Sequence, residues 1–231
     1  MIGFYNYTVY LTYFSLIVSG VGLYQAANGR PLVAIFCLMA SGLCDMFDGK
    51  IARTRHKSTE MERNFGIQLD SLADIVCFGV LPAVIGKSFF DEFMERKNIL
   101  MPRPALTASH VVVCSLGCLL ILCALIRLAY FNVTEEERQK NTDERRTSYI
   151  GLPVTSASLI FPLVYALTYT LARVLPDHVI LYFYALVMLV VAVCFVAPFS
   201  VRKPHGKALI FLSFVGVAEI AYLICVIRFL R

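Results

Sequence analysis

The chain has 231 residues, of which 58% are hydrophobic and 16% are charged, and its mean hydropathy is +0.71. A soluble domain of this size could not bury so much apolar surface, so the composition excludes a soluble globular protein and predicts a membrane protein. The net charge of +5 is modest and forms no long run. It argues against a nucleic-acid partner and favours contact with anionic membrane lipids.

Apolar stretches long enough to cross a bilayer, at about 20 residues per crossing, recur along the whole chain. We therefore predict an all-α integral membrane protein, a polytopic bundle of about six to eight transmembrane helices that forms a single domain over residues 1–231. Hydropathy and helix breakers place seven spans at about 7–27, 31–56, 64–86, 107–132, 150–174, 178–199 and 206–228. The last segment contains Gly216 and Glu219. It could instead form a hairpin of two shorter pieces, which would make eight.

Lys and Arg are distributed unequally between the two ends of this expected bundle, twelve against eight, with Lys50 left inside a helix. The positive-inside rule places the richer end in the cytoplasm of a multi-pass cell-membrane protein. The polar stretch 134–146 lies at that end. We interpret it as a solvated loop or surface helix, with closure over a polar substrate as the alternative. The richer end carries Arg53, Arg55, Lys57, Arg63, Arg127, Arg138, Lys140, Arg145, Arg146, Arg202, Lys203 and Lys207.

Four aspartates lie inside or at the ends of the second and third expected helices: Asp45, Asp48, Asp70 and Asp74. Each carboxylate within the membrane costs about 2.5–3.5 kcal/mol on insertion scales, so four together indicate a functional site. At 100° per residue, the first pair lies about 60° apart on one helix and the second about 40° apart on the next. If the two helices face each other, the two carboxylate pairs form a cage of hard oxygen ligands, which favours Mg²⁺ or Mn²⁺. Two such ions serve phosphoryl chemistry.

Small residues accompany these carboxylates. Gly49 and Ala52 on one helix and Gly66 on the other leave room for a ligand to approach closely. Arg53, directly after Ala52, can neutralise a diphosphate. Packing alone would explain any one of these small residues, but their spacing from the aspartates favours a ligand.

The combined pattern is Asp45-x-x-Asp48-Gly49-x-x-Ala52-Arg53, then, after twelve residues, Gly66-x-x-x-Asp70-x-x-x-Asp74. It resembles the motif of the CDP-alcohol phosphotransferase family, in which the connection between the two halves is often shorter. Three further segments are similar to the phosphatidylserine synthase branch of that family: FGIQLDSLADIVCFGVLPA at 65–83, RLAYFN at 127–132 and GLP at 151–153.

The resemblance implies an enzyme that transfers the phosphatidyl group of CDP-diacylglycerol to L-serine, releases CMP and works as a homodimer. The distribution of Lys and Arg places its active site at the cytoplasmic face. Carried over position by position, the resemblance makes Asp45, Asp48 and Asp70 metal ligands. Asp74 would lie near a second ion and act as general base. The same carry-over assigns the nucleotide and its diphosphate to Gly49, Ala52, Arg53 and Gly66.

A serine pocket needs a cation for the carboxylate, and the candidates are Arg127, Arg145 and Arg146, with Arg127 the first choice. The same arginines would suit a phosphorylated acceptor such as glycerol 3-phosphate or myo-inositol phosphate, and choline is a further alternative. The prediction that serine is the acceptor therefore rests mainly on the family resemblance. A cation transporter is a remote alternative, because it does not require the glycine, alanine and arginine at their observed spacing.

Overall fold

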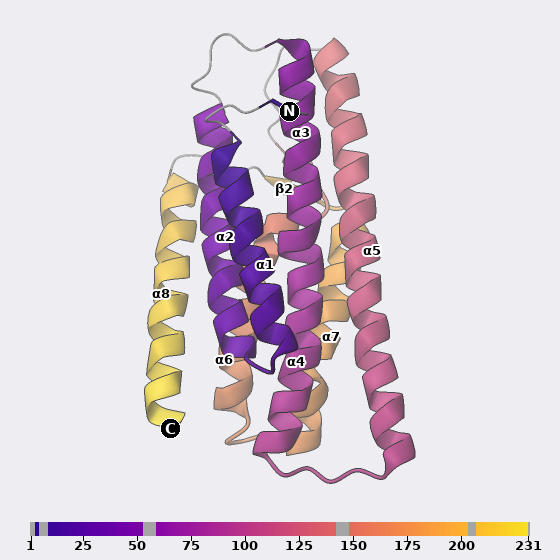
Figure 1. Cartoon of the computed structure of the whole chain (residues 1–231), viewed down its shortest axis with the longest axis vertical. Coiled ribbons are helices and arrows are strands. Elements are labelled where there is room, and N and C mark those ends of the chain that lie inside the picture. The colour runs from indigo at the N-terminus through magenta and orange to yellow at the C-terminus, as the bar shows by residue number, and fades with distance from the viewer. Residues whose placement is uncertain (1–2, 5–8, 53–58, 142–147, 203–206, 231) are drawn as a thin grey trace.

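The computed structural model of the chain describes residues 3–4, 9–52, 59–141, 148–202 and 207–230. Long helices run side by side along one axis (Figure 1). In chain order they are α1 (Tyr10–Ala27), α2 (Pro31–Ala52), α3 (Glu60–Asp74), α4 (Leu81–Arg96), α5 (Arg103–Asn141), α6 (Ala157–Leu171), α7 (Asp177–Val196) and α8 (Lys207–Leu230). Among the described residues, five helical segments are long and apolar enough to span a membrane. The predicted all-α polytopic fold is confirmed.

Two of these helices are joined end to end into one continuous helical rod through an irregular turn. The π-helical segment η1 (Ile75–Val80) joins α3 to α4, so that helical structure continues from Glu60 to Arg96. The described residues thus form seven rods, as expected. The hairpin alternative for the last segment is wrong, because α8 runs without a break through Gly216, which packs against Leu159 of α6, and through the buried Glu219.

Local signals explain where several helices begin and end. Gly29 has φ +70°, and the amide of Arg30 donates to the carbonyl of Gln25 at 2.9 Å, which closes α1 before Pro31 opens α2. Thr59 caps α3 in a reciprocal capping box with Glu62, so α3 begins four residues earlier than expected.

The polar stretch after the fourth span is helical as far as the structure describes it. α5 continues to Asn141, supported by ion pairs between Glu135 and Arg138 and between Glu136 and Lys140, each at 2.7 Å. The stretch is therefore a helix up to Asn141, closure over a polar substrate stays a prediction, and the remainder lies outside the described residues.

A short antiparallel ribbon was not anticipated from the sequence. β1 (Ser148–Ile150) pairs with β2 (Ser200–Arg202), and Tyr149 lies opposite Val201. Gly151 then turns the chain with φ +74°, and a 3₁₀ turn, η2 (Val154–Ser156), precedes α6. For this reason α6 begins at Ala157 instead of near 150.

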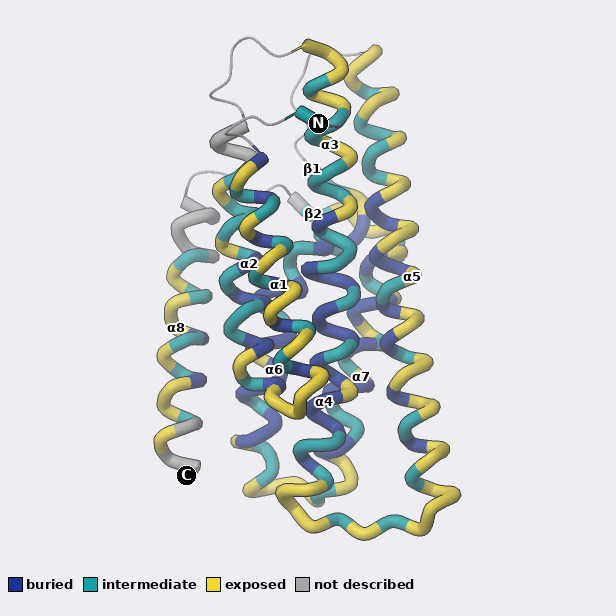
Figure 2. The backbone as a smooth tube through the Cα atoms, viewed as in Figure 1, coloured by how far each residue is buried: buried dark blue, intermediate teal, exposed yellow. Residues whose placement is uncertain are grey.

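The core lies where α4, α6 and α7 meet, and Figure 2 shows the buried positions gathered there. Tyr184 of α7 stacks on Phe161 of α6 and Phe89 of α4, with ring centroids 5.2 Å and 5.7 Å away. Large apolar side chains also stay exposed on the outer faces of α1, α5 and α7. Exposed apolar faces of this kind suit contact with lipid.

Candidate active site

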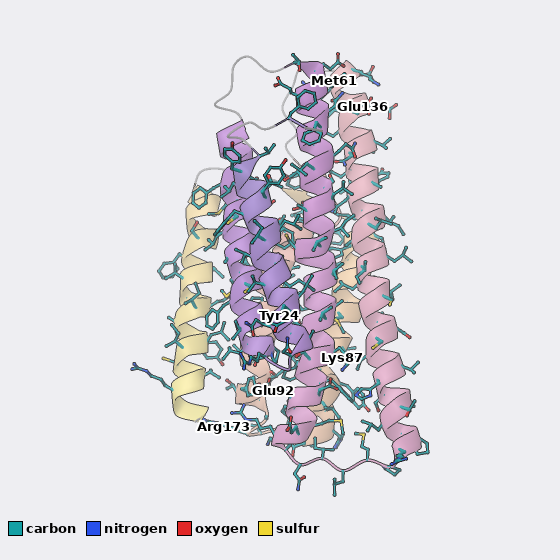
Figure 3. All side chains as sticks on the ribbon, viewed as in Figure 1. Tyr24, Met61, Lys87, Glu92, Glu136 and Arg173 are labelled. Atoms are coloured by element: carbon teal, nitrogen blue, oxygen red, sulfur yellow. The ribbon has the colours of Figure 1, made fainter. Side chains whose placement is uncertain are left out.

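A cavity of about 980 Å³ lies among α2, α3, α5, α6 and α8. One part of its wall is apolar and includes Met39, Leu43, Met46, Leu159, Val217 and Ile220. Another part is polar and includes Glu60, Arg63, Asn64, Glu136, Gln139 and Lys140. The polar part lies toward the end of the bundle that Met61 and Glu136 mark (Figure 3). Such a cavity fits a ligand that has a polar head and an apolar body.

Three of the four predicted aspartates converge at this cavity. Asp45 comes from α2, and Asp70 and Asp74 come from successive turns of α3. One carboxylate oxygen from each lies within 4.8 Å of the others, and all three residues line the cavity. Three hard oxygen donors at this spacing form a chemically suitable site for a divalent cation such as Mg²⁺ or Mn²⁺.

Close packing on both sides fixes the helix that carries Asp45. Ser41, one turn before Asp45, bonds to Ser19 of α1 at 2.8 Å and donates to the carbonyl of Ser15 at 3.1 Å. On the other side, a Cβ atom added to Gly42 would lie 2.2 Å from the hydroxyl oxygen of Ser158 in α6. α2 is thereby held between α1 and α6.

The remaining motif residues are placed unequally. Asp48 lies outside the group of three but within electrostatic range of Asp74. Gly66 lies one turn before Asp70, and an added Cβ atom there would meet nothing within 4 Å, so the space beside it is open. Gly49 and Ala52 belong to the last turns of α2. Arg53 lies outside the described residues.

Of the three arginines predicted for the acceptor, Arg127 lies at the cavity. Its side chain is only 8% exposed. The guanidinium carbon lies 5.4 Å from the ring centroid of Phe131 and 6.0 Å from that of Tyr149. These cation–π contacts, one from α5 and one from β1, orient the guanidinium group. Arg145 and Arg146 lie outside the described residues.

The structure adds cavity residues that the sequence interpretation did not single out. Asn132 of α5 donates from its side-chain nitrogen to the hydroxyl of Ser71 in α3, at 2.8 Å. Tyr149 of the unanticipated ribbon also lines the cavity. A signal existed for Asn132, because it ends the RLAYFN segment, and for Ser71, because it follows Asp70 directly. The sequence carried no such signal for Tyr149, since its position depends on the pairing of β1 with β2.

Comparison with known proteins agrees with this geometry. The family model for CDP-alcohol phosphatidyltransferase matches residues 5–230. The chain belongs to this family. The three carboxylates at the cavity belong to the motif at residues 45–74 that resembles this family. Members of the family generally use divalent metals.

Curated members of the family are similar over part of the chain. The CDP-diacylglycerol–serine O-phosphatidyltransferase of Saccharomyces cerevisiae is 37% identical over 127 residues, which are 54% of this chain and 38% of the yeast protein. That of Helicobacter pylori (strain 26695) is 26% identical over 63% of this chain and 51% of its own length. The archaetidylserine synthase of Methanothermobacter thermautotrophicus is 30% identical over 64% of this chain and 49% of its own length. The chain thus spans about half or less of these relatives.

Proposed function

We propose that this protein transfers the phosphatidyl group of CDP-diacylglycerol to L-serine and releases CMP. The observation that carries the proposal is the convergence of Asp45, Asp70 and Asp74 at a cavity with both polar and apolar walls. Family membership supports the transfer from a CDP-activated lipid, and three similar relatives bear names that specify serine.

In the proposed reaction, the serine hydroxyl oxygen attacks the phosphorus that bears diacylglycerol. A new P–O bond to serine forms, the bond from this phosphorus to the CMP oxygen breaks, and the products are phosphatidylserine and CMP. Asp74 is proposed to take the hydroxyl proton as general base, since it lines the cavity and one of its carboxylate oxygens lies within 4.8 Å of oxygens of Asp45 and Asp70.

The same residues fit a divalent metal. Asp45, Asp48 and Asp70 are proposed as ligands, with Asp74 beside a second ion, and their donors are the hard oxygens that Mg²⁺ or Mn²⁺ prefers. Two such ions, when bound, supply positive charge that stabilises the diphosphate and the departing CMP.

Substrate-binding roles complete the proposal. Gly66, with open space beside it, and Gly49 and Ala52 are proposed to lie along the CMP half, with Arg53 at the diphosphate. Arg127 is proposed to bind the serine carboxylate, because this buried residue lines the cavity and its guanidinium lies against two aromatic rings. Arg145 and Arg146 remain further candidates for that role.

The proposal includes a cellular setting. The catalytic unit is one domain over residues 1–231 in the cell membrane, with the cavity open to the cytoplasm. A homodimer is included because the family resemblance implies it, and cross-linking of the purified protein tests that state. The apolar cavity wall is proposed to receive the lipid part of CDP-diacylglycerol from the surrounding membrane lipids.

The direct test is an assay of the purified protein with CDP-diacylglycerol, Mg²⁺ or Mn²⁺, and a panel of acceptors: L-serine, glycerol 3-phosphate, myo-inositol phosphate and choline. We expect CMP release and formation of a new phospholipid with L-serine alone. Product formation with another alcohol and none with serine would overturn the acceptor while retaining the reaction class. Cation flux through reconstituted protein without CMP release would instead indicate a transporter.

A further inference from the structure

The hydrogen bond between Asn132 and Ser71 lies in the wall of the candidate active site. Both residues line the cavity, and Ser71 lies between Asp70 and Asp74 on α3. Asn132 lies on α5, five residues after Arg127, or about 7.5 Å along the helix axis. The bond therefore connects α3, which carries the proposed base Asp74, to α5, which carries Arg127, the residue proposed to bind the serine carboxylate.

The direction of this hydrogen bond determines what Asn132 offers to a ligand. Its side-chain nitrogen donates to the Ser71 hydroxyl at 2.8 Å, and a planar carboxamide carries its oxygen on the other prong. Within the described part of the chain, that amide oxygen has no hydrogen-bond partner. An amide oxygen accepts hydrogen bonds and suits an ammonium group, which has only donors.

An amino-acid acceptor carries two charged groups, and Arg127 accounts for one of them. A guanidinium group matches a carboxylate, but it repels an ammonium group. Serine therefore also needs an acceptor at the cavity wall, within reach of both Arg127 and Asp74. Asn132 can supply that acceptor, since it lines the same cavity as Arg127 and Asp74 and Ser71 binds the nitrogen side of its amide.

We infer that Asn132 recognises the ammonium group of the amino-acid acceptor through its side-chain oxygen and that Ser71 is the positioning residue that orients it. The inference rests on the proposed function and deepens it, because it makes Asn132 the residue that selects an amino acid over other alcohols. A purely structural role would be an interhelical hydrogen bond that joins α3 to α5, as polar side chains do in membrane proteins.

The test compares L-serine with 3-hydroxypropanoate, which keeps the carboxylate and the hydroxyl but lacks the ammonium group. For the unaltered protein, the inference requires L-serine to bind at least about tenfold more tightly, the order expected for a hydrogen bond to a charged group. Equal affinity for the two compounds would overturn it without any variant.

The variants then assign this preference to the pair. Asn132→Ala should raise the KM for L-serine by about tenfold while the inhibition constant of 3-hydroxypropanoate and the KM for CDP-diacylglycerol change by less than about twofold. Ser71→Ala should shift the same ratio in the same direction by a smaller factor, and Ser71→Thr, which keeps the hydroxyl, should restore it. Thr134→Val is the matched control on α5, because Thr134 bonds only to backbone carbonyls and does not line the cavity.

Two failures are distinguishable. If the unaltered protein releases CMP with L-serine but Asn132→Ala weakens both compounds equally, the pair is structural and the inference alone is overturned. The same holds if the variant leaves the KM for L-serine unchanged. If the unaltered protein releases no CMP with L-serine, the proposed acceptor is wrong and the inference fails with it.

Discussion

Asp45, Asp70 and Asp74 place like charges together in the membrane-spanning part of the protein. Within the described residues, no Lys or Arg forms an ion pair with any of the three. Carboxylates this close repel each other, and burial in a membrane protein increases the free-energy cost of charging them. A divalent cation bound at this group would offset both costs at once.

Substitution of Asp70 tests this interpretation. Asp70→Asn keeps the shape of the side chain but removes its charge, so we expect CMP release to fall to background while the protein still inserts and elutes as a folded species. The assay is CMP release at saturating Mg²⁺ or Mn²⁺, with size-exclusion chromatography in detergent. Asp91→Asn is the matched control, because Asp91 pairs with Lys87 and His110 far from the cavity. Substantial activity in Asp70→Asn would exclude an essential ligand role.

Arg127 gives a second prediction at the level of single residues. Arg127→Lys keeps the positive charge but loses the planar pair of donors that matches a carboxylate. We expect a higher KM for L-serine, by on the order of 1–3 kcal/mol in apparent binding, and a nearly unchanged KM for CDP-diacylglycerol. Arg96→Lys is the control, since Arg96 lies over Tyr169 and does not line the cavity. An unaltered KM for L-serine would limit Arg127 to a role in packing or topology.

The aspartates could be predicted from the sequence because one helical period relates their spacing to a shared face. Asp70 and Asp74 are one turn apart, and any helix places them together. Asn132 and Ser71 are different, because their contact depends on the rotation of α5 relative to α3. That rotation is set by packing along the whole length of both helices, which local spacing does not encode.

At the level of elements, the contact of α2 with α6 sets the position of Asp45. Gly42→Ala would place a methyl group 2.2 Å from the Ser158 hydroxyl oxygen and 2.4 Å from its Cβ atom. Overpacking of this kind typically costs 1–3 kcal/mol, so we expect the thermal denaturation midpoint to fall by roughly 2–10 °C and activity to fall with it. Thermal denaturation in detergent and CMP release measure the two effects.

Two further variants make this prediction specific. Gly20→Ala in α1 is the matched control, because an added Cβ atom there meets nothing within 4 Å, and it should be neutral or slightly stabilising. The double variant Gly42→Ala with Ser158→Gly should recover most of the lost stability, since the second change removes both clashing atoms. If Gly42→Ala is as stable as the unaltered protein, α6 yields at this contact and does not fix α2.

The helices were predictable as elements, whereas their irregular parts were not. Hydropathy located all seven rods, and among the described residues five of them are long and apolar enough to span a membrane, where a helix satisfies its backbone hydrogen bonds internally. The π-helical turn at Ile75–Val80 and the ribbon of β1 and β2 leave no such periodic signal. Both depend on tertiary contacts: Phe78 in the π-helical turn is fully buried, and Tyr149 in the ribbon packs against Phe131.

For the molecule as a whole, the two ends of the bundle differ in chemistry. Met61 and Glu136 lie at one end, and Glu92 and Arg173 lie at the other (Figure 3). The first end carries the polar continuations of α3 and α5 and the polar wall of the cavity. A soluble acceptor such as serine would enter there, and this is also the end to which the twelve Lys and Arg residues were assigned.

The orientation of the bundle can be measured with single cysteines at opposite ends, introduced after the eight native cysteines are replaced. Leu100 is 89% exposed in the connection between α4 and α5, and Glu136 is exposed on the polar end of α5. Because the richer positive end should face the cytoplasm, a membrane-impermeant maleimide should label Leu100→Cys in intact spheroplasts. It should label Glu136→Cys only after the membrane is permeabilised. The reverse pattern would place the polar end of the cavity outside the cell and would overturn the proposed cytoplasmic active site.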